Sequence, residues 1–184
     1  MTTQHYYSCG MEEFMYLEKI QSPEDVKKLD VEQLKVLAGE MRQALIQKLS
    51  VHGGHVGPNL GMVEATIAMH YVFDSPKDKM VFDVSHQSYC HKMLTGRVDA
   101  FLDEAKYDDV SGYSEPSESA HDFFCIGHTS TSVSLACGLA KARDLADENY
   151  NVIAVIGDGS LSGGEALEGL DFAKELNGNL IVVV

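Results

Sequence analysis

The residues of this chain best suited to chemistry stand in three short segments rich in glycine, histidine and hydroxyl groups. Asp158 lies between two glycines in VIAVIGDGSLSGG, where an apolar run ends. His86 follows the apolar segment MVFDV, and Gly127, His128 and Thr129 open the segment GHTSTS. A carboxylate suits a hard cation such as Mg²⁺, and glycine lets the backbone approach a ligand closely. These residue types favour a site for a diphosphate that carries a divalent cation.

The dipeptide Asp158-Gly159 is common in hairpin turns between apolar strands, but the residues after it predict a helix. Ser162 and Glu165 have the spacing of a capping box. Apolar residues then recur at helical spacing, at Ala166, Leu170, Ala173 and Leu176. We therefore expect Asp158, Gly159 and Ser160 at the positive end of a helix, where anions are stabilised. Nucleotide-binding α/β proteins also end strands in acids and glycines, so this segment alone does not select a ligand.

The individual histidines leave alternatives open. A single histidine after a strand, such as His86, is more often a surface or core residue, although a neutral imidazole there can donate to a phosphate. The hydroxyls of GHTSTS suit helix capping near Thr131, a phosphate or thiazole site, or both. His52 and His55 lie three residues apart in a Gly-rich loop without further ligands at metal-site spacing. Composition gives His55 no priority over His52 for proton transfer.

These segments must be positioned by regular elements, and four apolar runs predict strands. The runs lie at residues 80–84, 121–127, 151–157 and 179–184, and each of the first three is followed by a segment of helical periodicity. Strands separated by helices pair in parallel, because the crossover must return the chain in the same direction. The predicted fold class is therefore α/β, a parallel sheet flanked by helices. Ligands of such sheets bind beyond the carboxyl ends of the strands, so the three segments should meet at one edge.

The remaining elements follow from capping residues and helical spacing. A helix that begins at Asp30 has an apolar face made of Leu34, Leu37, Met41, Leu45 and Leu49. An irregular loop over residues 52–61 leads to a helix around residues 62–73. The acidic stretch 99–120 contains YSEPSES, which we expect to be a surface loop. The helix after GHTSTS should bury Val133, Cys137, Ala140 and Leu145.

Length and charge restrict the class of protein. A chain of 184 residues can bury one ordinary core, and 45% hydrophobic and 23% charged residues are average for a globular domain. The formal net charge of −14 argues against nucleic acid or anionic lipid as the main partner. Any phosphate would be held by backbone amides, helix N-termini or a bound cation.

Other features of the sequence exclude several alternatives. No apolar stretch approaches the roughly 20 residues of a membrane-spanning helix, and no secretory signal precedes residue 15, so the predicted location is cytoplasmic. The cysteines form no C-x-x-C pair and are interpreted as reduced thiols, at Cys9, Cys90, Cys125 and Cys137. The absence of P-loop, G-x-G-x-x-G and G-x-S-x-G patterns argues against kinase, dehydrogenase and serine hydrolase chemistry.

Several segments together resemble the N-terminal part of the 1-deoxy-D-xylulose-5-phosphate synthase family, within the transketolase superfamily. They are GGHVGPNLGMVEATIAMHYVF, FDVSHQSYCHKMLTGR, GYSEPSES, IGHTSTSVSLACGLAKARDL and AVIGDGSLSGGEALEGL. The resemblance implies thiamine diphosphate and Mg²⁺ as cofactors. It assigns the metal to Asp158 and cofactor contacts to His86, Gly127, His128, Thr129, Gly159 and Ser160. His55 matches an active-site histidine that assists proton transfer.

The same resemblance implies an activity and a domain organisation. The family condenses pyruvate with D-glyceraldehyde 3-phosphate and releases CO₂ for isoprenoid, thiamine and pyridoxal synthesis, and its members usually form homodimers. Its metal motif continues to an Asn after the next strand, and its catalytic Glu belongs to a later domain; neither is in this sequence. We therefore expect a lead-in over residues 1–24 and a partial cofactor-binding domain over 25–184, truncated and with little activity alone. The alternatives are a subunit of a split transketolase-type enzyme and a noncatalytic truncated chain.

Overall fold

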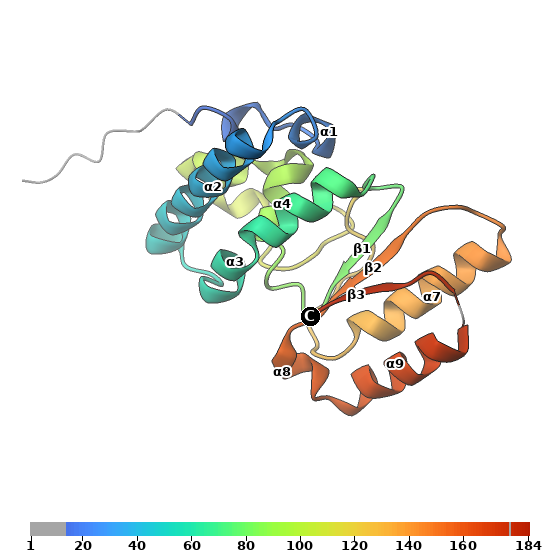
Figure 1. The fold of residues 1–184 in the computed structure, drawn as a ribbon. Coiled ribbons are helices and arrows are strands. Elements are labelled where there is room, and N and C mark those ends of the chain that lie inside the picture. Colours follow the sequence, from blue (N-terminus) through green and yellow to red (C-terminus); the bar gives the residue numbers. More distant parts are fainter. Residues whose placement is uncertain (1–13, 177) are drawn as a thin grey trace, which may run out of the picture.

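The part of the chain that the structure describes contains one parallel sheet. The structure, a computed structural model, describes residues 14–176 and 178–184, so Cys9 and most of the predicted lead-in lie outside the described part. The sheet has the order β1 (Lys79–Phe82), β2 (Val152–Val155) and β3 (Ile181–Val183) (Figure 1). Both pairings are parallel, with Val81 opposite Ala154 and Ala154 opposite Val182. The predicted α/β class with parallel pairing is confirmed.

Helices cover both faces of this sheet. The helices α7 (Ser132–Leu145) and α9 (Gly164–Leu176) lie against one face, and α4 (Val63–Val72) lies on the other (Figure 1). Because successive side chains of a strand point to opposite faces, the strands contribute to two apolar clusters. The α7 side buries Val81, Val152 and Ala154, and the opposite side buries Met80, Phe82, Ile153 and Val155. Burial on both faces explains why β2 is apolar at every position.

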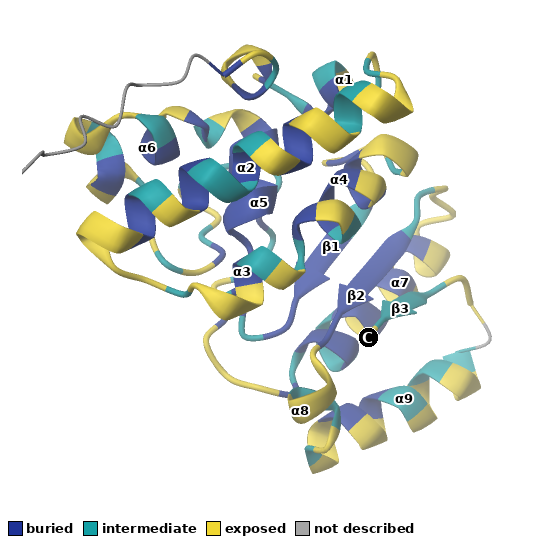
Figure 2. Ribbon diagram, turned by 60° about the vertical axis from the view of Figure 1, so that its left-hand side comes forward, coloured by how far each residue is buried: buried dark blue, intermediate teal, exposed yellow. Residues whose placement is uncertain are grey.

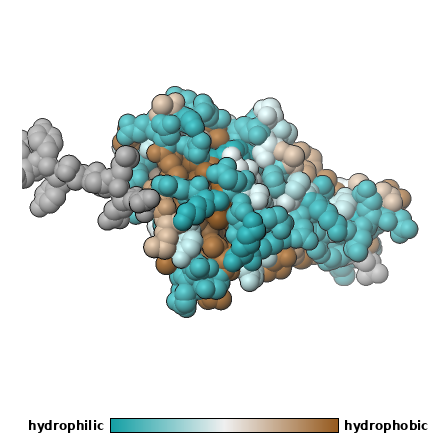
Figure 3. Space-filling view, turned by 90° about the horizontal axis from the view of Figure 1, so that it is seen from above, coloured by the Kyte–Doolittle hydropathy of each residue, from teal (hydrophilic) through white to brown (hydrophobic). Residues whose placement is uncertain are grey.

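The rest of the chain forms a helical layer and the connections around the strand ends. Its elements are η1 (Leu17–Lys19), α1 (Pro23–Val26), α2 (Val31–His52), α3 (Gly57–Gly61), α5 (Tyr89–Lys92), η2 (Met93–Arg97), α6 (Asp99–Leu102), η3 (Glu104–Asp109) and α8 (Asp158–Leu161). Figure 2 shows that the inner turns of α2, α4 and α5 are buried, as are β1 and β2. Polar side chains cover most of the face in Figure 3, with apolar ones gathered between them.

Helix α2 confirms the helix predicted after Asp30. The Asp30 carboxylate accepts the N–H of Gln33 at 2.9 Å, and the Gln33 side chain accepts the N–H of Asp30 at 2.9 Å, which together form a capping box. Its predicted apolar face is buried at Leu37, Met41, Leu45 and Leu49 and half-buried at Leu34. The same cluster buries Leu17 and Ile20, which precede residue 25 in the chain.

The strand predicted at residues 121–127 is wrong, because this segment is irregular and pairs with none of the three described strands. Phe124 and Ile126 instead lie against the α7 side of the sheet, and the Ile126 carbonyl accepts the hydroxyl of Ser85 at 2.9 Å. An apolar run indicates that a segment is buried, but a buried segment need not pair as a strand.

Three smaller expectations also change. The Gly-rich loop at 52–61 contains the short helix α3 in its second half. Leu145 is 75% exposed and does not contribute to the buried side of α7, although Val133, Cys137 and Ala140 do. YSEPSES is only partly a surface loop, because Ser114 is buried and Glu118 pairs with a buried lysine.

Two findings concern membranes and thiols. Among the described residues, no helix has the length and apolar character that crossing a membrane requires. Of the described cysteines, Cys90 and Cys137 are buried free thiols and Cys125 is an exposed one.

Candidate functional site

A cleft of about 680 Å³ opens at the carboxyl ends of β1 and β2. One side is formed by α3, the start of α4 and the segment after β1, which contributes His86 and Gln87. The other side is formed by the segment after β2, which contributes Gly157, Asp158 and Ser160. The structure therefore brings His86, Asp158 and Ser160 together, as the parallel-sheet argument predicts.

Asp158 is exposed at the rim of this cleft. It is the first residue of α8, and its Oδ1 accepts the N–H of Gly159 at 2.8 Å. A Cβ added at Gly157 or Gly159 would meet no described atom within 4 Å, so the backbone beside Asp158 is open to a ligand. The helix predicted after Asp158 is confirmed, but it is divided, with α9 beginning at Gly164.

Asp83, the other carboxylate that lines the cleft, is already bound by the protein. It directly follows β1 and is 1% exposed. Its Oδ2 accepts the N–H of Ser130 and its Oδ1 accepts the N–H of Ser132, both at 2.9 Å. Asp83 therefore caps the first turn of α7 from a distant part of the chain, whereas the side chain of Thr131 makes no capping hydrogen bond. The capping role predicted near Thr131 belongs to Asp83.

His86 carries a ring nitrogen suited to a ligand. Its Nδ1 is buried and has no hydrogen-bond partner among the described residues. Burial lowers the pKa of His86, and the charge of His55 lowers it further. A base with a lowered pKa stays neutral near pH 7, so this imidazole can donate or accept one hydrogen bond.

The backbone before His86 is strained. Val84 and Ser85 have φ values of 58° and 68°, in the left-handed region that favours glycine. Ser85 is fully buried and its hydroxyl holds this conformation, donating to the Ile126 carbonyl at 2.9 Å and accepting the N–H of Ser114 at 2.8 Å. Positions held in such conformations cluster at functional sites.

Gly127, His128 and Thr129 lie outside the main cleft. They are exposed, and the first two line an adjoining pocket of about 330 Å³ with Glu165. The two regions are joined by Ser130, whose hydroxyl donates to the Ser160 carbonyl at 2.7 Å. A side chain at Gly163 would collide with this Ser130 hydroxyl, which explains the glycine there.

His55 lies next to His86 but lines a separate pocket of about 230 Å³, together with His52 and Tyr89. Their ring centroids are 5.5 Å apart, and the His55 ring is also 5.3 Å from that of Tyr113. His55 Nδ1 is 3.2 Å from the hydroxyl of Tyr89. His52 instead pairs with Asp108 at 2.8 Å and is exposed. His55 is therefore the histidine of this pair that lies beside His86, a distinction that the sequence alone could not make.

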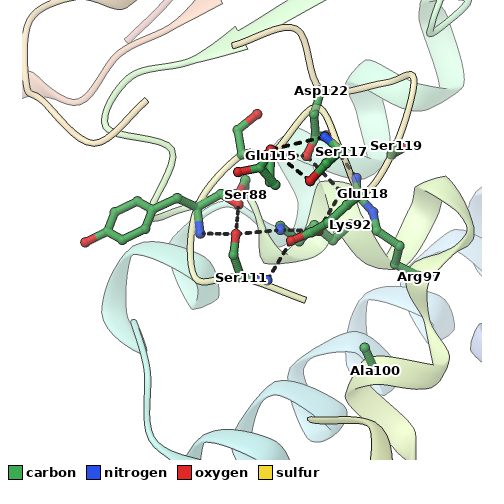
Figure 4. Close-up of polar contacts among 12 residues, drawn as sticks. Ser88, Lys92, Arg97, Ala100, Ser111, Glu115, Ser117, Glu118, Ser119 and Asp122 are labelled. Atoms are coloured by element: carbon green, nitrogen blue, oxygen red, sulfur yellow. Dashed lines mark hydrogen bonds and ion pairs between the residues drawn. The ribbon is translucent and has the colours of Figure 1, made fainter. Parts of the chain in front are cut away.

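The loop over His55 is fixed by a buried ionic cluster that sequence reasoning missed (Figure 4). Lys92 pairs with Glu118 at 2.5 Å, and Arg97 pairs with Glu118 at 3.1 Å and with Asp122 at 2.8 Å. Glu118 also accepts the N–H of Ser111 at 2.6 Å. Burial alone raises the pKa of the Asp122 carboxyl, but hydrogen bonds from His91 and Arg97 lower it by more. The charges show no periodic spacing, so no sequence pattern indicates them.

Asn59 was also missed, and it lies between the two histidines. Its side chain is buried beneath α3 and bonds to the carbonyls of both His55 and His86. Its partners are four and 27 positions away in the chain. Their spacing follows no motif that a sequence could display.

Comparison with known proteins identifies the family. The family model for 1-deoxy-D-xylulose-5-phosphate synthase, for its N-terminal part, matches residues 17–184. The chain belongs to the 1-deoxy-D-xylulose-5-phosphate synthase family. Similar proteins of that name include those of Dictyoglomus turgidum, 52% identical over 170 residues, and of Pelotomaculum thermopropionicum, 53% identical over 168. The matches cover 92% and 91% of this chain but 28% and 26% of those proteins, so the chain spans about a quarter of their length.

Three of the segments that resemble the synthase family line the cleft, and a fourth, GHTSTS, lies beside it. HVGPNLG contains α3 and Asn59, and FDVSHQ contains Asp83 and His86. GHTSTS leads into α7, and GDGS forms the start of α8. Residues from all four segments therefore reach one edge of the sheet, through the parallel topology rather than through closeness in the chain.

Proposed function

We propose that this chain provides the metal- and diphosphate-binding part of a 1-deoxy-D-xylulose-5-phosphate synthase, which condenses pyruvate with D-glyceraldehyde 3-phosphate and releases CO₂. The observation that carries the proposal is the cleft at the strand ends. It has an exposed carboxylate, Asp158, on one side and, on the other, the buried Nδ1 of His86, which has no hydrogen-bond partner in the described part of the chain. Membership of the synthase family supports the same assignment.

The residues present fit a magnesium diphosphate. Within the described residues, no group of three or more His, Cys, Asp and Glu side chains could hold a metal ion. Mg²⁺ does not need such a cage, because it usually keeps several waters and takes one or two carboxylates together with substrate phosphates. Asp158 would supply the carboxylate, since both oxygens of Asp83 are occupied by backbone N–H groups.

Thiamine diphosphate, when bound, supplies a nucleophilic carbon for the pyruvate carbonyl and an electron sink for the loss of CO₂. Gly159 and Ser160 would lie beside its diphosphate, and the exposed segment Gly127, His128 and Thr129 would contact it from the adjoining region. The neutral His86 ring would bind it through Nδ1. His55 would move a proton to or from the substrate, and Tyr89, 3.2 Å from His55 Nδ1, would orient that ring.

The proposal extends to the setting of the enzyme. We expect a homodimer in the cytoplasm, with pyruvate and D-glyceraldehyde 3-phosphate as substrates. The net charge of −14 supports small anions held locally with a cation rather than a nucleic acid or an anionic membrane as partner.

Calorimetry tests the cofactor assignment. The protein is titrated with thiamine diphosphate in the presence of Mg²⁺ and again with EDTA. We expect binding that depends on Mg²⁺ and that the Asp158→Asn substitution weakens by on the order of a hundredfold, because it removes the charge that holds the metal. Asp171→Asn, at an exposed acid on α9, is the matched control and should bind as the wild type does. Absence of binding, or equal binding by the Asp158 variant, would overturn the proposal.

A further inference from the structure

Asn59 occupies the point where the two predicted site histidines approach each other. It is 0% exposed, and its Nδ2 donates to the carbonyl of His55 at 2.7 Å and to the carbonyl of His86 at 2.8 Å. Its Oδ1 accepts the N–H of Tyr89 at 2.9 Å. A side-chain amide has two N–H donors, and both are committed to the two histidine segments.

The backbone at both histidines lacks regular structure that could fix it. His55 follows Gly53 and Gly54, which have φ values of 83° and 129°, and belongs to no helix or strand. His86 follows two residues in the left-handed region. Each ring therefore depends on specific hydrogen bonds for its position, and Asn59 provides one to each segment.

Asn59 also acts on His55 by a second route. The backbone N–H of Tyr89 is held by Asn59, and the Tyr89 hydroxyl lies 3.2 Å from His55 Nδ1 and accepts the His55 N–H at 3.4 Å. Tyr89 is 5% exposed, so it has little freedom to move independently. One buried amide thus determines both the backbone of His55 and the partner of its ring.

We infer that Asn59 is a positioning residue whose amide sets the separation of the His55 and His86 rings, which is 5.5 Å between centroids. The inference rests on the proposed function only where it concerns cofactor binding by His86 and proton transfer by His55. The geometric statement can be tested without any ligand.

The first test uses NMR on protein labelled in its histidine rings. Wild-type protein should show a cross-relaxation peak between the rings of His55 and His86, because the ring centroids are 5.5 Å apart. Asn59→Ala should abolish this peak and shift both sets of ring resonances. Val63→Ala is the matched control, since it removes buried methyl groups from the next helix but no hydrogen bond to either histidine. Retention of the peak in Asn59→Ala, or its equal loss in Val63→Ala, would overturn the inference.

A second variant separates the two routes and does not depend on the folding of Asn59→Ala. Tyr89→Phe removes the hydroxyl beside His55 but leaves the N–H that Asn59 binds. We expect a shift of the His55 ring resonances with His86 unchanged. Equal displacement of both rings would show that Tyr89, rather than Asn59, sets the pair.

Binding provides the functional readout. Asn59→Ala should weaken Mg²⁺-dependent binding of thiamine diphosphate by about tenfold to a hundredfold, the range for removal of a group that orients a binding side chain. Val63→Ala should bind as the wild type does once both are folded. If the wild type does not bind, the proposed function fails, while the ring measurement still decides the role of Asn59. Unchanged affinity in a folded Asn59→Ala would contradict the inference.

Discussion

On one side of the candidate site, the histidine side (residues 53–59 and 83–89), several polar side chains are buried and hydrogen-bonded, whereas the segment around Asp158 (residues 157–163, which includes α8) is exposed or half-buried throughout. Asn59, Ser85 and Ser88 have no exposed surface, and each makes hydrogen bonds to backbone groups. Asp158 accepts a hydrogen bond from its neighbour Gly159 and is solvent-accessible. The comparison teaches that hydrogen bonds within the protein hold the polar groups of the histidine side, whereas the Asp158 carboxylate is open to solvent and has a partner only in the neighbouring residue.

This difference gives two expectations about substitutions. When a substitution removes one partner of a buried hydrogen bond, the polar group left behind stays desolvated without a partner, which destabilises the folded state. Variants on the histidine side should therefore unfold more easily. An exposed carboxylate has little desolvation energy to lose, so variants of Asp158 should alter binding alone. The four predictions below test this contrast, in order of decreasing effect.

The largest effect is expected at Asp122, which fixes the loop above His55. Asp122→Ala leaves Arg97 and His91 buried beside an empty position, and removal of one partner from a buried ion pair costs about 3–5 kcal/mol. Urea denaturation measures the loss of unfolding free energy. Asp99→Ala, which breaks the exposed pair with Lys106, is the control and should cost below about 1 kcal/mol. Equal losses in the two variants would contradict the burial argument.

Two substitutions at Ser85 distinguish the effect of backbone strain on stability from the effect of hydrogen bonding. Ser85→Ala loses two buried hydrogen bonds and keeps a Cβ at φ 68°, so it should destabilise the protein by about 1–3 kcal/mol. Ser85→Gly loses the same bonds but relieves the steric conflict of a left-handed residue, which is worth about 1–2 kcal/mol. Thermal unfolding should therefore rank wild type, glycine and alanine in that order. A glycine variant less stable than the alanine variant would show that the strain is negligible.

The pH dependence of stability should follow buried histidines near the ionic cluster. Burial, together with the charge of His91, lowers the pKa of His121 from 6.5 to about 4. Above pH 6.5 the residue is neutral in both states and contributes no slope. Between pH 6.5 and 4 the unfolded chain binds a proton that the folded protein does not, so stability falls as the pH falls.

The variant His121→Asn tests this assignment, because its amide can keep a hydrogen bond to Ser75 and cannot be protonated. We expect it to reduce the slope between pH 6.5 and 4 by up to one proton, measured by urea denaturation at several pH values. His70 and His91, whose pKa values burial also lowers, should keep part of the slope. Identical profiles for wild type and variant would assign the whole slope to other groups.

The smallest effect on stability is expected at Asp158, the proposed metal-binding residue. Asp158→Ala should change the free energy of unfolding by less than about 0.5 kcal/mol, because the side chain is exposed and its acceptor role is local. Urea denaturation without Mg²⁺ or thiamine diphosphate measures this. A loss above about 1 kcal/mol would show that Asp158 belongs to the folded framework and would remove the contrast between the two sides.

The sequence predicted the features that depend on local pattern and on parallel topology. Alternating strand and helix segments gave the sheet, and the rule for strand ends correctly brought His86, Asp158 and Ser160 to one cleft. The strand at 121–127 was wrong because burial and pairing leave the same apolar signal. Gly127 and His128 line an adjoining pocket and Thr129 is exposed beside them, since their segment does not continue a strand.

The features of the site that the sequence did not predict depend on residues that are far apart in the chain. Asn59 binds His86 across 27 positions, and Arg97 binds Glu118 across 21. Neither separation follows a helical or strand repeat, so the residue types of YSEPSES predicted only a surface loop. The choice between His52 and His55 likewise required the positions of Asp108, Tyr89 and His86.

Asp83, directly after β1, caps the start of α7, so this end of the helix depends on its packing against the sheet. Its carboxylate reaches Ser130 and Ser132 across 47 and 49 positions, and α7 has 14 residues, a length at which isolated helices are marginal in water. The hydrogen bonds of the first turn of α7 are therefore complete only when β1 is packed beside it. During hydrogen exchange, the amides of Ser130 and Ser132 should open together with β1, as one cooperative unit, and not with the free end of their own helix.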